Sequence, residues 1–67
     1  MQFHPKEIQE KIDYLLDPYT YGINMFERKN VLKMNSYSSL LPSQVSLIEY
    51  YYRDAKSYMD ALSEEPF

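Results

Sequence analysis

The sequence contains no cysteine, one histidine and one glycine among its 67 residues. Without cysteine the chain cannot form a disulfide framework, a thiolate zinc site, an iron–sulfur cluster or a cysteine nucleophile. A single glycine argues against phosphate-binding loops, because those loops need several glycines where the backbone approaches the phosphate. The lone His4 has no second histidine with which to form a metal site, and the serines lack a hydrolase motif. We therefore expect a protein that is not an enzyme and takes no metal, cofactor or small-molecule substrate.

Long apolar runs are also missing, since no stretch approaches the roughly 18 residues that a membrane-spanning helix requires. Ten acidic residues against seven basic ones give a net charge of −3. That charge opposes the phosphate neutralisation on which nucleic-acid affinity depends. We expect a soluble cytoplasmic protein, inside a host cell if a virus encodes it, with no membrane partner and no general affinity for nucleic acid.

Residues that form a hydrophobic core are plentiful, with 45% of the chain hydrophobic and 16% aromatic. This is more than disordered segments carry, and the length suits one small domain. The pattern predicts an all-α fold, a compact three-helix arrangement over residues 1–67 with a long C-terminal amphipathic helix. The predicted helices cover about residues 5–16, 23–35 and 43–63.

The first helix has a signal at each end. Pro5 suits the first helical position, with His4 as N-cap and Phe3 placed to contact Ile8 in a hydrophobic staple. The helix is expected to end before Asp17-Pro18, because a residue that precedes proline avoids the helical conformation. One face carries the apolar residues Ile8, Ile12, Leu15 and Leu16.

The middle of the chain allows two interpretations. Apolar and polar residues alternate at strand period from Tyr19 to Met25, so an α+β alternative places a short hairpin around residues 19–37. That hairpin lacks the favoured Asn-Gly or Asp-Gly turn. We prefer a helix over about 23–35, which places Ile23, Phe26, Val31 and Met34 on one broad face and leaves Met25 and Leu32 on the opposite face.

The last helix shows the clearest periodicity. Its apolar residues recur at alternating spacings of three and four and form a seam along one side of the helix. Further apolar residues along one edge of this seam, the flank, make the apolar face wider than one packing helix covers. We expect the first helix to pack its apolar face against Val45, Ile48, Tyr52 and Met59, with the second helix crossing between the two. The full seam is Val45, Ile48, Tyr52, Ala55, Met59 and Leu62, and the flank is Leu47, Tyr51 and Tyr58.

Eight tyrosines are the unusual feature of the composition. Consecutive residues of a helix point about 100° apart, so Tyr50-Tyr51-Tyr52 cannot all face one core. Tyrosine is common in binding hot spots, and a chain this small often gains stability from a partner. The sequence therefore predicts a non-catalytic protein-protein interaction module, an adaptor or inhibitor that binds a larger protein. The candidate partner-binding residues are Tyr50, Tyr51, Tyr58, Leu47, Met25 and Leu32.

Two alternatives stay open. The same stripe could join copies of the chain, as a structural subunit of a homo-oligomer or of a large, possibly viral, assembly. The second alternative is a small nucleic-acid-binding accessory protein, in which basic side chains contact phosphates and nearby rings stack on bases. Its candidate residues are Arg28, Lys29 and Lys33 with Tyr19, Tyr21 and Tyr37.

Overall fold

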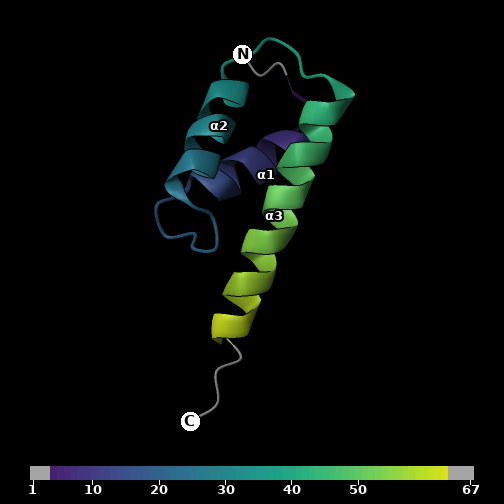
Figure 1. Cartoon of the computed structure of the whole chain (residues 1–67). Helices are drawn as coiled ribbons and strands as arrows, with labels where there is room; N and C mark the ends of the chain where they lie inside the picture. Colours follow the sequence, from purple (N-terminus) through teal and green to yellow (C-terminus); the bar gives the residue numbers. More distant parts are fainter. Residues whose placement is uncertain (1–3, 64–67) are drawn as a thin grey trace.

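Three α-helices form the structure, a computed structural model that describes residues 4–63 (Figure 1). They are α1 (Lys6–Leu16), α2 (Met25–Asn35) and α3 (Pro42–Ser63). The predicted all-α fold with a long C-terminal helix is confirmed. The hairpin alternative around residues 19–37 is wrong, because α2 occupies most of that segment.

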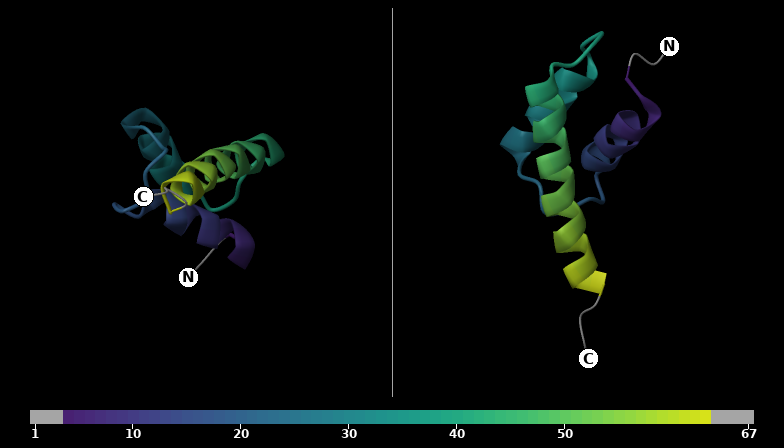
Figure 2. Two further views of the ribbon diagram at one scale, coloured as in Figure 1. Left: turned by 90° about the horizontal axis from the view of Figure 1, so that it is seen from below. Right: turned by 90° about the vertical axis from the view of Figure 1, so that its right-hand side faces the viewer.

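The longest helix, α3, projects beyond the other two and gives the chain its elongated shape of 45 × 22 × 21 Å (Figure 1). Figure 2 shows α1 and α2 lying against different sides of α3. Contact is extensive between α1 and each of the other helices but sparse between α2 and α3. The expectation that the second helix crosses between the others is therefore wrong. The reason is that α1 has the richer aliphatic face, whereas α2 buries only Val31 and Met34.

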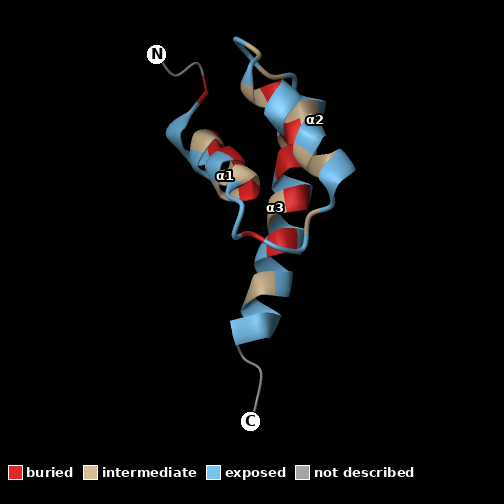
Figure 3. Cartoon of the chain, turned by 90° about the vertical axis from the view of Figure 1, so that its left-hand side faces the viewer, coloured by how far each residue is buried: buried red, intermediate tan, exposed pale blue. Residues whose placement is uncertain are grey.

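The core lies where the three helices meet, as the buried segments in Figure 3 show. Burying such side chains supplies the main stabilising free energy of a chain this small. Four side chains are fully shielded from solvent: Ile12, Leu15, Val31 and Ile48. Around them lie Ile8, Met34, Tyr51 and Ala55. The seam predicted for the last helix is only partly realised, since Val45, Tyr52 and Met59 are partly buried and Leu62 is exposed.

The N-terminal end of α1 differs from its prediction. The helix begins at Lys6 with Pro5 as its N-cap, and no side chain caps it. His4 does not cap the helix but is buried, and its Nε2 atom has no hydrogen-bond partner among the described residues. Phe3 of the predicted staple lies outside the described residues.

The C-terminal end of α1 is held by side chains from outside the helix. The Thr20 hydroxyl donates to the carbonyl oxygen of Tyr14 at 2.6 Å. The Arg28 guanidinium, from α2, donates to the carbonyl oxygens of Leu15 and Asp17 at 3.2 and 3.3 Å and also to that of Thr20. The last carbonyls of a helix have no partner within it. One side chain of α2 therefore fastens both the end of α1 and the following loop.

A capping box fixes the start of α2. The Asn24 side chain accepts a hydrogen bond from the Glu27 backbone N–H at 2.7 Å, and the Asn24 N–H donates to the Glu27 carboxylate at 3.2 Å. The side chain of each residue thus accepts a hydrogen bond from the backbone N–H of the other. The helix consequently starts at Met25 rather than at about residue 23.

Asn24→Ala is expected to lower the free energy of unfolding by about 1 kcal/mol, because the Glu27 N–H loses its acceptor. Thermal unfolding followed by circular dichroism measures the loss. Asn24→Asp is the matched control, since its carboxylate still accepts from the same N–H. An equal loss in the two variants would contradict the capping role.

Candidate interaction surface

The structure divides the six predicted partner-binding residues into two groups. Tyr51 belongs to the core, with 8% of its surface exposed, and its hydroxyl accepts a hydrogen bond from the Asn30 side chain at 3.5 Å. Leu47 is partly buried and packs against the core. Placing Tyr51 on a free surface was wrong, and Leu47 keeps only part of its surface exposed. Tyr51 follows Ile48 by three residues and precedes Ala55 by four, so it shares their buried face.

The other four residues are exposed, but on two different helices. Tyr50 and Tyr58 lie on α3, with 54% and 50% of their surfaces exposed. Met25 and Leu32 lie on α2 and are 74% and 58% exposed. The opposite-face placement of Met25 and Leu32 in the helical interpretation is confirmed.

Phe26 is the surface residue that the sequence analysis missed. It was expected to share the core face with Val31 and Met34, but 77% of its surface is exposed. Phe26 precedes Val31 by five positions, and at about 100° per position this places the two about 140° apart around the helix. This angle could have predicted from the sequence that Phe26 is exposed. The core face of α2 is narrow and does not extend around the helix to Phe26.

Two lysines lie among these apolar residues. Lys29 follows Met25 by four residues and Phe26 by three, and Lys33 follows Phe26 by seven, so the five side chains share one side of the helix. Neither lysine has a carboxylate within ion-pair distance in the part of the chain that the structure describes. We call this side the α2 outer face: Met25, Phe26, Lys29, Leu32 and Lys33.

The residues of the nucleic-acid alternative do not form one surface. The Arg28 guanidinium is already engaged, because it donates to backbone carbonyls at the end of α1 and in the following loop. Tyr37 packs partly buried against the core, whereas Tyr19 and Tyr21 are exposed on the loop between α1 and α2. Only Lys29 and Lys33 of the basic cluster are left to face solvent.

That loop approaches the projecting end of α3. The Tyr21 backbone N–H donates to the sulfur of Met59 at 3.4 Å. Gly22 lies beside Tyr58 and Ala55, with no room for a Cβ atom. The part of α3 that extends beyond α1 and α2 is mostly exposed (Figure 3). Tyr58 and Leu62 are about half exposed, so Leu62 of the predicted seam is not buried.

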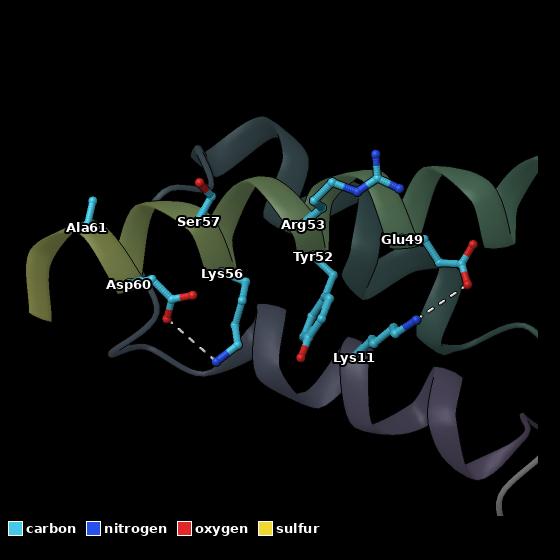
Figure 4. A pocket seen from close by; sticks show the side chains of 8 residues that line it. All are labelled: Lys11, Glu49, Tyr52, Arg53, Lys56, Ser57, Asp60 and Ala61. Carbon is cyan, nitrogen blue, oxygen red and sulfur yellow. Dashed lines mark hydrogen bonds and ion pairs between the residues drawn. The ribbon is translucent and has the colours of Figure 1, made fainter. Parts of the chain in front are cut away.

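A shallow depression of about 730 Å³ lies on another side of α3 (Figure 4). Four of its charged residues form two ion pairs: Lys11 with Glu49 at 3.4 Å and Lys56 with Asp60 at 3.7 Å. The Lys11 ammonium also lies 5.5 Å from the centre of the Tyr52 ring. Exposed pairs of this kind contribute little stability, and none of the residues that line the depression is buried. Nothing in its geometry favours a ligand or a reaction.

Within residues 4–63, no cluster of histidine, aspartate and glutamate side chains has the arrangement of a metal site. Of the helices in the same range, none combines the length and the apolar character needed to cross a membrane. Comparison with known protein families, with curated proteins and with solved structures found no match to this chain.

Proposed function

We propose that this chain is a non-catalytic protein-binding domain of the cytoplasm, an adaptor or inhibitor that docks onto a larger protein through exposed apolar side chains. The observation that carries the proposal is the α2 outer face. Met25, Phe26 and Leu32 each expose more than half of their surface on a single two-turn stretch of helix. On α3, Tyr50 and Tyr58 add exposed rings.

Isolated exposed hydrophobic residues are normal, but several on one face mark a contact site. Removing a fully exposed phenylalanine side chain from water is worth about 1.5–3 kcal/mol. The fold covers less than half of the surface of each of these three side chains, and α2 is anchored through Val31, Met34 and the Arg28 hydrogen bonds. A partner that covers the α2 outer face would bury the apolar surface that these side chains expose in the free chain.

The test begins with capture of the partner from the native host on the tagged full chain, followed by calorimetric titration. Phe26→Ala is expected to weaken binding about 30-fold, the effect of losing one hot-spot side chain. Helicity should be unchanged, because the ring lies outside the core. Tyr19→Ala is the matched control, since it removes an equally exposed ring from the loop instead of from α2.

The proposal requires that the apolar residues contribute to affinity. Equal affinity of the unchanged chain and of alanine variants at Met25, Phe26, Leu32, Tyr50 and Tyr58 would contradict it.

A further inference from the structure

We infer that the α2 outer face receives an acidic amphipathic segment of another protein, whose apolar residues cover Phe26 and its neighbours while its carboxylates pair with Lys29 and Lys33. The inference rests on the proposed function and adds the chemistry of the partner. Three features of the described residues carry it: the spacing of the face, its charge, and the charge of the surrounding chain.

The spacing of the face matches a helical partner. Met25 and Leu32 lie seven residues apart, or about 10 Å along the axis at 1.5 Å per residue. Two turns of an apposed helix present apolar residues over the same length, at the i, i+3 or i+4 and i+7 positions that helical segments use for docking. Lys29 lies between the apolar residues and Lys33 beside them, so carboxylates bordering such a stripe reach both ammonium groups.

The charge of α2 distinguishes it from the rest of the chain. Its three basic residues against one acidic residue give +2, and since the whole chain carries −3, the remainder carries −5. Arg28 is already engaged with backbone carbonyls. The two cations that remain lie in the α2 outer face, among apolar side chains that a partner must desolvate.

A purely apolar partner would leave those ammonium groups facing a surface that cannot bind them. Burying an unpaired charge is costly, whereas a charge-assisted hydrogen bond to a carboxylate compensates the lost hydration. Lysine stems also cover apolar surface while the ammonium group reaches outward. The complementary partner therefore carries an apolar stripe bordered by aspartate or glutamate.

A membrane or a nucleic acid fits this surface less well. Both are extended polyanions that reach beyond one short helix face, and α1 exposes Glu7, Glu10 and Asp13. Charges interact over a Debye length of about 8 Å at physiological salt, so an extended anion experiences the net charge of −5 outside α2. A short acidic segment confined to the face contacts mainly the two lysines.

The test is selection of short random peptides displayed on phage against the immobilised full chain. A second selection uses Lys29→Glu/Lys33→Glu, and a third uses Lys6→Glu/Arg53→Glu, which changes the net charge equally at exposed positions outside the face. The unchanged chain and the control should enrich peptides rich in aspartate or glutamate with apolar residues at helical spacing. The reversed face should lose that acidic preference.

A synthesised winning peptide should bind the reversed variant about 30-fold more weakly than the control, since two ion pairs become repulsions. Phe26→Ala should weaken the same peptide, and added salt should weaken it further. Enrichment without an acidic excess, the same winners on the reversed face, or no enrichment would overturn the inference. So would tighter binding, lost on the reversed face, to phosphatidylserine vesicles or to an oligonucleotide.

Failure of the inference is distinguishable from failure of the proposed function. Peptides that respond to Phe26→Ala but not to charge reversal would overturn the acidic chemistry and leave apolar docking intact. A host partner indifferent to every apolar truncation would overturn the proposed function itself.

Discussion

Gly22→Ala is expected to lower the free energy of unfolding by about 3 kcal/mol, for two reasons that act together. The φ angle of Gly22 is +87°, in the left-handed region that costs other residues roughly 1–2 kcal/mol. A Cβ atom at this position would also lie 2.7 Å from the Cβ of Tyr58 and 3.1 Å from the Cα of Ala55. Neither atom can move away by rotating a side chain, because both are fixed by the backbone of α3.

The consequence should be visible as partial unfolding, because a core in a chain of this size rarely supplies more than about 3–5 kcal/mol. Urea denaturation followed by far-ultraviolet circular dichroism measures the change. Gly22→Asn separates the two causes, since asparagine tolerates positive φ better than alanine but carries the same Cβ atom. A midpoint unchanged by Gly22→Ala would mean that the loop does not rest against α3 as described.

Periodicity sufficed to predict the three helices, because helix formation in this chain follows the burial of regular apolar faces. Ile8, Ile12 and Leu15 recur on one face of α1, and that face is buried. The same reasoning failed for Phe26, because the predicted apolar face of α2 was wider than the area that the neighbouring helices cover. Hydrophobicity predicts that a side chain prefers burial, but the width of the contact between two helices decides whether that side chain can be buried there.

The candidate site was harder to predict because it depends on which side chains the fold leaves outside. Of three consecutive tyrosines, the sequence could show that one must point away from the core but could not place α2 against α3. The hydrogen bond between Asn30 and Tyr51 reflects that placement. Met25 and Leu32 were identified correctly, since they oppose Val31 and Met34 on any regular helix.

Local polar signals were present in the sequence but ambiguous there. Asn24 and Glu27 have the spacing of a capping box, yet the alternation of the preceding residues obscured the helix start. From the sequence, Arg28 was grouped with the neighbouring cations Lys29 and Lys33. Its actual partners are backbone carbonyls before and after Pro18, which only the folded chain brings within reach.

Arg28→Ala is expected to destabilise the chain by about 3 kcal/mol, the second large effect. Hydrogen bonds from a charged donor contribute about 1.5–3 kcal/mol each, and this guanidinium serves Leu15, Asp17 and Thr20. Its removal leaves the C-terminal carbonyls of α1 without their side-chain donor, and partial access to water recovers some of the loss. Urea denaturation measures the total.

Two further variants test the cause. Lys29→Ala removes the same charge from the next position, where the side chain is exposed, and should change stability by less than about 0.5 kcal/mol. Arg28→Lys should recover only part of the loss, because an ammonium group lacks the planar array of donors that spans several carbonyls. The loss should also persist at high salt, since the acceptors are neutral. Equal effects of Arg28→Ala and Lys29→Ala would show that charge, and not carbonyl capping, sets the contribution.

Arg28 also connects stability to the proposed surface. It lies on the same helix as Phe26, on nearly the opposite side from that ring, and its hydrogen bonds hold α2 against the end of α1. If that anchor sets the orientation of the α2 outer face, the Arg28→Ala chain that remains folded should bind a selected acidic peptide more weakly, although Arg28 itself is not part of the face. Hydrogen exchange should then show faster exchange of the α2 amides in this variant than in Lys29→Ala, because only the former loses the link between α2 and the loop.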